Sequence, residues 1–372
     1  MAREPHIARG ASRHVRPEIA SPPEQGINRG YMTNKLSDQG VRVFTTFPPS
    51  SGGRAGSYLE HVERIAEWSE RAGCAGALIY SDNNLVDPWL IAQAVIARTE
   101  RLLPLIAVQP VYMHPYTAAK LVASLGFMHN RRVCLNLVAG GFTKDLAALN
   151  DLTPHDERYA RLIEYARIVT ALLMSSTPVT LDGQYYRVTN LKLSPALDPA
   201  LVPELFVSGS SEAGLAAAAA VGALAVQYPR PVAEYESEPL APGQRTGIRV
   251  GIVARETAAE AWEVAHQRFP ADRQGQLTHQ LAMKASDSRW HQQLSALGRE
   301  STSLGDVYWT FPFENYKTFC PYLVGSYDRV AEELARYIGV GCSTIILDVP
   351  ANEEELLHIG TALSRTAHVS AR

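Results

Sequence analysis

Two serines stand where an apolar run gives way to a helix. Residues 205–208 form the apolar run, Gly209, Ser210 and Ser211 follow it, and an alanine-rich segment comes next. Hydroxyls and free backbone N–H groups at a helix N-terminus stabilise a phosphate dianion. A plain helix N-cap, which one serine alone would satisfy, is the other interpretation of this pattern.

A charged side chain also falls inside an apolar run. Arg249 lies within residues 249–254, which have the pattern of a buried strand. A buried cation has to find an anion, because desolvation of an unpaired charge is unfavourable. Arg249 is therefore a candidate catalytic residue.

Polar groups follow two further apolar runs. Asn136 lies near the end of one of them, where its amide can donate and accept hydrogen bonds, or instead tie down the next loop. Gln109, Tyr112 and His114 follow the preceding run and would line the same surface. A lone histidine is more often structural, so His114 is a candidate catalytic residue on its position alone.

The elements that would position these residues alternate regularly. Helical patterns of 10–18 residues separate apolar runs, which is typical of a parallel sheet buried on both faces. Eight such runs favour a closed (β/α)8 barrel over a doubly wound sheet, and no GxGxxG follows the first run to support a dinucleotide fold. Enzymes on such barrels carry their sites at the C-terminal ends of the strands. The predicted strands are 41–46, 75–79, 103–108, 133–138, 205–208, 223–226, 249–254 and 343–347.

Three segments depart from this alternation. Residues 179–191 predict a β-hairpin, with Asp182-Gly183 as its turn. Residues 231–239 leave room for barely two turns of a sixth helix. Residues 267–323 form a long insertion, which we expect over the C-terminal mouth of the barrel. Residues 1–37 predict a flexible extension before a single domain, residues 38–372, and Met32 is a candidate true start.

Composition restricts the class of protein. The 372 residues are 46% hydrophobic and 20% charged, with a formal charge of −3, which favours neither nucleic acid nor an anionic membrane as partner. No apolar stretch is long enough to span a bilayer. The four cysteines are isolated and no metal-binding motif is present, so we expect reduced thiols, a cytoplasmic location and no metal.

Six strings, in order along the chain, resemble the luciferase-like flavin monooxygenases and most closely their alkanesulfonate monooxygenase branch. Each string is weak alone, but their order makes the resemblance specific. It covers roughly residues 41–367. The strings are Asn136 to Gly141 (NLVAGG), His155 to Tyr159 (HDERY), Asp182 to Tyr186 (DGQYY), Ser208 to Ser211 (SGSS), Arg249 with Ala254 to Thr257 (ARET), and Leu323 to Ser326 (LVGS) leading into Val330 to Glu332.

The resemblance implies a function and a set of site residues. The family uses reduced FMN from a separate NAD(P)H:flavin reductase, captures O2 as a flavin C4a-peroxide and oxygenates a small organic substrate. Its members usually form homodimers or homotetramers. The matching cofactor-binding residues would be Asn136, His155, Tyr159, Gly209, Ser210 and Ser211, and the substrate-binding residues Tyr112, Tyr316 and Lys317.

Departures from the sulfonate enzymes fall at the substrate end. Leu85, Gly251 and Val349 stand where those enzymes carry a cysteine, a histidine and a tyrosine. We therefore expect a substrate other than a short alkanesulfonate, with at most one anionic group, which Arg249 would meet. Six aromatic residues within 308–319 would form a lid over it, or simply pack the insertion.

Two other functions fit the same fold. An F420-dependent oxidoreductase would use the barrel for hydride transfer in place of oxygen activation. A non-catalytic flavin-binding barrel would be expected to be shorter than this chain.

Overall fold

The computed structural model describes residues 36, 38–51, 53, 56–237, 243–285, 294–295 and 307–369. The predicted N-terminal extension, apart from Leu36, lies outside these residues, and so does part of the predicted insertion. Everything below refers to the described residues.

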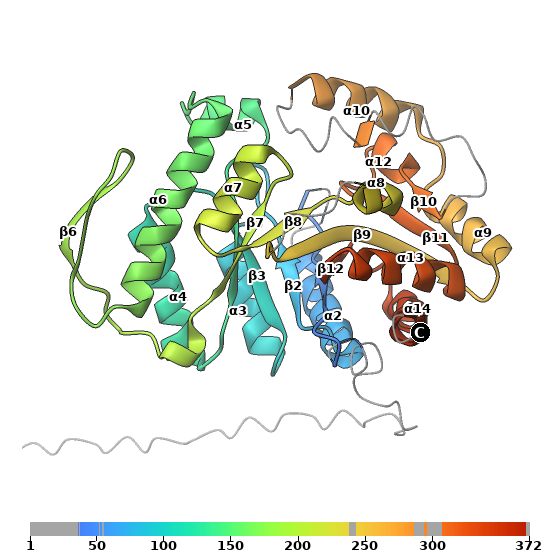
Figure 1. The fold of residues 1–372 in the computed structure, drawn as a ribbon, viewed down its shortest axis with the longest axis horizontal. Coiled ribbons are helices and arrows are strands. Elements are labelled where there is room, and N and C mark those ends of the chain that lie inside the picture. Colours follow the sequence, from blue (N-terminus) through green and yellow to red (C-terminus); the bar gives the residue numbers. More distant parts are fainter. Residues whose placement is uncertain are drawn as a thin grey trace, which may run out of the picture.

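Eight parallel strands close into a barrel, which confirms the predicted fold class (Figure 1). Hydrogen-bonded neighbours run in the order β1-β2-β3-β4-β7-β8-β9-β12, and β12 pairs with β1 to complete the ring. Each predicted strand corresponds to one of these. Their bounds are β1 Arg42–Thr46, β2 Gly76–Ile79, β3 Leu103–Val108, β4 Cys134–Val138, β7 Glu204–Ser208, β8 Leu224–Gln227, β9 Thr246–Arg255 and β12 Cys342–Leu347.

Large apolar side chains from around the ring fill the interior of the barrel. Phe44, Leu105 and Phe206 are fully buried there, and Phe44 and Phe206 meet edge to face with centroids 5.7 Å apart. The absence of a side chain at Gly76 leaves space for the ring of Phe44, because a Cβ at Gly76 would overlap that ring. The lower part of the barrel is therefore a packed core, and a site has to lie above it.

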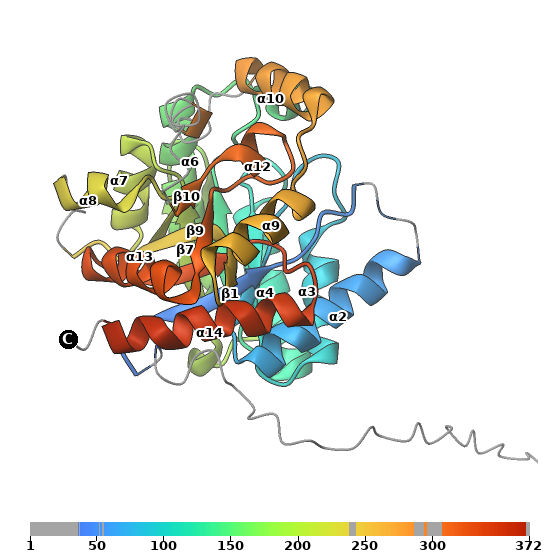
Figure 2. The same ribbon diagram turned by 90° about the vertical axis from the view of Figure 1, so that its right-hand side faces the viewer.

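Helices cover the outside of the ring (Figures 1 and 2). Each long helix buries one face: in α2, Val62, Ile65 and Ala66 are inaccessible to solvent. No helix in the described part of the chain is long and apolar enough to cross a membrane. The helices are α2 Ser57–Ala72, α3 Pro88–Arg98, α4 Pro115–His129, α5 Thr143–Ala148, α6 His155–Met174, α7 Glu212–Ala220, α8 Val232–Ser237, α9 Ala258–Arg268, α10 Arg273–Ala285, α12 Phe311–Glu314, α13 Tyr327–Gly339 and α14 Glu353–Val369, with a 3-10 turn at Pro199–Leu201.

Strand β9 is longer than the sequence predicts, because it has two sets of partners. Its first half pairs with β8 and β12 within the ring, and its second half pairs in parallel with β11, Tyr322–Ser326. A short strand β10, Tyr308–Trp309, runs antiparallel to β11. Residues 323–326 therefore belong to an additional strand outside the ring, and α13 leads from it to β12.

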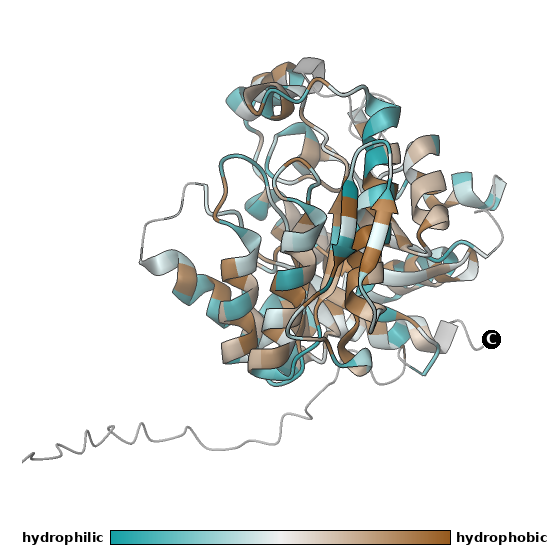
Figure 3. Ribbon diagram, turned by 90° about the vertical axis from the view of Figure 1, so that its left-hand side faces the viewer, coloured by the Kyte–Doolittle hydropathy of each residue, from teal (hydrophilic) through white to brown (hydrophobic). Residues whose placement is uncertain are grey.

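The predicted hairpin is confirmed as β5, Val179–Asp182, paired antiparallel with β6, Arg187–Leu191. It lies outside the barrel, and hydrophobic and hydrophilic residues alternate along it (Figure 3). The carboxylate of Glu164 in α6 accepts hydrogen bonds from the backbone N–H groups of Gln184, Tyr185 and Tyr186. The hairpin turn is thus fixed to the helix beside it.

Candidate active site

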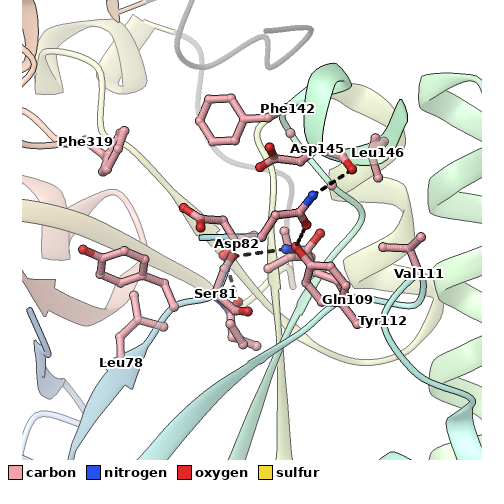
Figure 4. A pocket seen from close by; sticks show the side chains of 18 of the residues that line it. Leu78, Ser81, Asp82, Gln109, Val111, Tyr112, Phe142, Asp145, Leu146 and Phe319 are labelled. Atoms are coloured by element: carbon pink, nitrogen blue, oxygen red, sulfur yellow. Dashed lines mark hydrogen bonds between the residues drawn. The ribbon is translucent and has the colours of Figure 1, made fainter. Parts of the chain in front are cut away.

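A cavity opens where the barrel strands end. It encloses about 1010 Å³ of empty space, including solvent at its entrance. The loops after β2, β3 and β4 line it, together with the ends of β7 and β8, Arg249 of β9 and Phe319 of the insertion (Figure 4). This is the surface on which barrel enzymes carry their sites. The charged residues among those that line the cavity are Asp82, Asp145 and Arg249.

Arg249 lies at the base of the cavity between two tyrosines. Its side chain is 8% exposed, and its guanidinium lies over the rings of Tyr80 and Tyr228, at 5.3 and 5.8 Å from the centroids. One Nη donates to the hydroxyl of Tyr228 at 3.2 Å. The other lies 3.5 Å from the carboxylate of Asp348. The anion that a buried arginine requires is therefore supplied by the protein itself.

Asp348 follows β12 directly and is itself held by neighbours. Its Oδ2 accepts hydrogen bonds from Thr318 Oγ1 at 2.6 Å and from Tyr322 Oη at 2.8 Å. Burial alone would raise the pKa of Asp348, but Arg249 and these two donors lower it. Burial alone would lower the pKa of Arg249, but Tyr228, Cys320 and Asp348 raise it. Both members of the pair are charged at neutral pH.

The turn from β7 to α7 forms a second polar centre. Ser211 caps α7, since its hydroxyl accepts from the backbone N–H of Gly214 at 3.1 Å. The hydroxyl of Ser210 is buried and has no hydrogen-bond partner in the described structure. Tyr159 of α6 packs so closely on Gly209 that a Cβ there would overlap its hydroxyl. An unsatisfied donor beside a helix N-terminus fits a phosphate, so the residues present suit FMN.

The remaining predicted cofactor residues lie around this turn. Asn136 of β4 is 4% exposed and lines the cavity, and its side-chain oxygen accepts from Ser208 Oγ at 2.8 Å. His155 opens α6, bonds Asp156 at 2.7 Å and meets the ring of Tyr159 edge to face. His155 and Tyr159 do not line the cavity, and Tyr159 contacts Gly209 in the β7–α7 turn.

His114 is the predicted catalytic residue that the structure separates from the cavity. Its Nδ1 accepts from the backbone N–H of Tyr116 at 3.2 Å, so it caps α4, and its ring packs against Tyr186 of the hairpin. It is not among the residues that line the cavity, whereas Gln109 and Tyr112 of the same loop are. The geometry gives His114 a structural position, and its catalytic role stays a prediction.

Of the three predicted substrate-binding residues, one lines the cavity and two do not. Tyr112 lines the cavity and donates to Asn83 Oδ1 at 2.7 Å; burial, followed by the charges of Asp145 and Asp82, raises its pKa to about 12. Tyr316 and Lys317 do not line the cavity. Lys317 forms an ion pair with Asp272 at 2.5 Å, and Phe319 is the insertion residue that reaches the cavity.

Most of the aromatic cluster of the insertion packs the insertion itself. Tyr308 and Phe313 are buried, and Trp309 stacks on Phe311 and meets Trp262 of α9. Of the six predicted lid residues, Phe319 alone lines the cavity. The packing of these side chains favours the interpretation in which the aromatic residues pack the insertion, and a lid over the substrate stays a prediction.

The three departures at the substrate end do not enlarge the cavity. The ring of Tyr322 fills the space beside Gly251, since a Cβ at Gly251 would overlap it. Leu85 and Val349 do not line the cavity. The glycine accommodates Tyr322, whose hydroxyl binds Asp348.

Sequence reasoning missed several residues of the site. Tyr80, Tyr228 and Asp348 each stand directly after a barrel strand, so the rule that pointed to Asn136 would have found them. Asp82 lies on the loop after β2 and Asp145 in the short helix α5, and neither belongs to a motif that the sequence would reveal. In the described part of the chain, no group of three or more histidine, cysteine, aspartate or glutamate side chains could hold a metal ion.

Comparisons with known proteins identify the family. The model of the luciferase-like monooxygenases matches residues 40–344. The chain is 36% identical over 307 residues, 81% of this chain and 89% of the relative, to the 4-(gamma-L-glutamylamino)butanoyl-[BtrI acyl-carrier protein] monooxygenase BtrO of Niallia circulans.

Solved structures share the fold at low identity. DmoA from Hyphomicrobium sulfonivorans has a TM-score of 0.68 at 16% identity, covering 86% of this chain and 85% of its own. An F420-dependent secondary alcohol dehydrogenase has a TM-score of 0.59 at 14% identity, covering 88% and 99%. With a family model that spans most of the sequence and a relative above 30% identity, this chain belongs to the luciferase-like monooxygenase family.

Proposed function

We propose that this protein is a two-component flavin-dependent monooxygenase, which takes reduced FMN from an NAD(P)H:flavin reductase and uses O2 to oxygenate a small organic substrate. The observation that carries the cofactor assignment is the buried, unpartnered hydroxyl of Ser210. It lies at the N-terminus of α7, two residues after Ser208 of the cavity wall. A phosphate there would accept hydrogen bonds from Ser210 and from the first backbone N–H groups of α7.

Asn136, which lines the cavity, and Tyr159, which lies outside it, suit the rest of the cofactor. Asn136 would bind a polar edge of the isoalloxazine, and Tyr159 would hold the β7–α7 turn against the phosphate. The reduced flavin supplies the electrons that activate O2. The protein contributes orientation and shelter from water, since the cavity is largely apolar and Phe319 is one of the residues that line it (Figure 4).

The charges that remain in the cavity favour a substrate with a cationic group. Arg249 is neutralised by Asp348, whereas Asp82 and Asp145 take part in no ion pair in the described structure. Burial and the charge of Asp82 raise the pKa of Asp145, which shows that the two carboxylates are close enough to interact. Phe142 and Phe319 lie around the same end of the cavity (Figure 4), and aromatic faces also attract cations.

The name of the relative from Niallia circulans is consistent with a substrate that carries a cationic group. BtrO acts on a 4-(gamma-L-glutamylamino)butanoyl group. A glutamyl group that is linked through its γ-carboxyl keeps both a free α-ammonium and a free α-carboxylate, so it offers a cation as well as an anion. We propose that the substrate of the present enzyme likewise carries an ammonium group, which Asp82 and Asp145 would bind, next to a chain that lies along the apolar wall.

Oxygen-coupled turnover tests the proposal. The full chain, a generic flavin reductase, NADH and FMN would be supplied with ω-amino acyl thioesters of pantetheine, with the matching acyl thioesters without the amine, and with short alkanesulfonates. We expect the amino acyl compounds to give the most product per flavin oxidised. Asp145→Asn should lower their coupling without affecting the uncharged acyl compounds.

Two results would contradict the proposal. Activity with reduced F420, without O2 and without FMN, would show that the barrel performs hydride transfer, as in the F420-dependent alcohol dehydrogenase whose fold it shares. Efficient coupled turnover of an alkanesulfonate would show that the cavity accepts anions.

A further inference from the structure

Asp348 lies where several elements meet. It is the first residue after β12, at the rim of a packed barrel, and its side chain is 11% exposed. Three elements converge on its carboxylate: Arg249 from β9, Tyr322 from β11 and Thr318 from the insertion. A carboxylate with this many fixed partners is held in one orientation.

The surrounding side chains prevent the carboxylate from turning away from Arg249. The ring of Tyr322 is seated on Gly251, where a Cβ would overlap it, so its hydroxyl has a fixed position under Asp348. Arg268 stacks on the outer side of Tyr322 at 5.6 Å and donates to the carbonyl of Val349, and it does not line the cavity. Arg249 is thus the cation that lines the cavity, and Asp348 is held next to it.

We propose that Asp348 is a specificity-determining residue, which cancels the charge of Arg249 and thereby excludes anions from the cavity. The inference rests on the proposed function only in that it treats this cavity as the substrate site. An anion that enters would meet a neutral pair, and the two carboxylates of Asp82 and Asp145 nearby. In a partly desolvated site, the difference between a paired and an unpaired arginine is large enough to reverse the preference for charge.

Probe binding to the flavin-free full chain tests this inference. Hexane-1-sulfonate would be titrated by calorimetry into the wild type, Asp348→Asn and the double variant Arg249→Met/Asp348→Asn. We expect Asp348→Asn to bind the probe at least tenfold more tightly than the wild type, and the double variant to lose this gain. Asp145→Asn is the matched control: it removes one negative charge from the same cavity but leaves Arg249 paired, so its gain should be clearly smaller.

Two outcomes would overturn the inference: no gain in Asp348→Asn, or an equal gain in Asp145→Asn. If Asp348→Asn does not fold, the double variant decides, because replacing both members of a buried ion pair is far better tolerated than removing one. Wild type and double variant should then bind hexane-1-sulfonate equally weakly. If the wild type instead binds hexane-1-sulfonate at least tenfold more tightly than the double variant, the charge of Arg249 attracts anions in spite of Asp348, and the inference is wrong. Because the readout is binding, its failure is distinct from failure of the oxygenation assay.

Discussion

Ser210 and Ser211 are neighbours in the sequence but have different physical roles. The hydroxyl of Ser211 satisfies a backbone N–H of α7, as an ordinary N-cap does. The hydroxyl of Ser210 is buried and unsatisfied, and leaving such a group unpaired is unfavourable by about 1–3 kcal/mol. A phosphate at the N-terminus of α7 would satisfy the hydroxyl of Ser210.

The two serines can be separated experimentally. Ser210→Ala is expected to weaken the binding of reduced FMN by about 1–3 kcal/mol, because a charge-assisted hydrogen bond to phosphate is lost, while thermal stability does not fall. Ser211→Ala should lower both the affinity for reduced FMN and the thermal stability. It also removes the cap of α7, which is worth about 1 kcal/mol. Anaerobic fluorescence titration and thermal unfolding provide the measurements.

Ser237→Ala is the control for this pair. Ser237 is exposed at the end of α8, where its hydroxyl bonds only the carbonyl of Ala233. Replacing Ser237 with alanine should change neither the affinity for reduced FMN nor the thermal stability. Unchanged FMN affinity in Ser210→Ala would mean that the phosphate binds elsewhere.

At the scale of elements, β9 connects the barrel to the additional strand β11. Its first half closes the ring and its second half carries β11, so one strand positions both Arg249 and the tyrosine that holds Asp348. Gly251 stands at the change of partner, where β11 begins to pair. The absence of a side chain at Gly251 allows the ring of Tyr322 to lie on the strand.

Gly251→Ala should therefore destabilise the protein. Its Cβ would overlap the ring of Tyr322, and forcing a methyl group into packed space is unfavourable by about 1–3 kcal/mol. Gly325→Ala on β11 is the matched control, because the nearest atom to its Cβ is 3.7 Å away, an ordinary contact. We expect Gly325→Ala to change the free energy of unfolding by less than about 1 kcal/mol. Urea unfolding of both variants gives the comparison, and equal stabilities would refute this account of Gly251.

At the scale of the whole molecule, the barrel interior supports the site. Phe44, Leu105 and Phe206 form a closed layer of apolar side chains under the cavity, all fully buried. Such a layer keeps the strand ends at fixed separations. Because Arg249 and Asp348 come from adjacent strands, the distance between them depends on that layer.

Phe44→Ala is expected to lower the free energy of unfolding by about 3–5 kcal/mol, since it leaves a cavity in the barrel core. Phe127→Ala, at a residue that is 74% exposed, should change it by less than about 0.5 kcal/mol. Denaturant titration followed by far-ultraviolet circular dichroism measures both. Similar values for the two variants would show that the packing of Phe44 in the barrel interior does not stabilise the fold.

The sequence determined the barrel and the position of its mouth. Buried parallel strands have continuous apolar runs, and helices between them have a 3.6-residue period, so local patterns contain the order of elements. Asn136 and Ser210 could be found because each is a polar residue at or near the end of a strand, and Arg249 because it is a charged residue inside an apolar run. Residues 323–326 were not recognised as a strand outside the ring, because an apolar run does not specify its partner.

Only the tertiary structure decided how the charges of the site are combined. Arg249 and Asp348 are 99 positions apart in the chain, and Asp82 lies on a loop and Asp145 in the short helix α5, where no periodic pattern marks them. The sequence required an anion for Arg249 but could not say whether substrate or protein supplies it. That choice depends on the pairing of β9 with β12 and on the packing of Tyr322 over Gly251, which are contacts between distant segments. The charge of the cavity is a sum over such contacts, and therefore a property of the folded barrel.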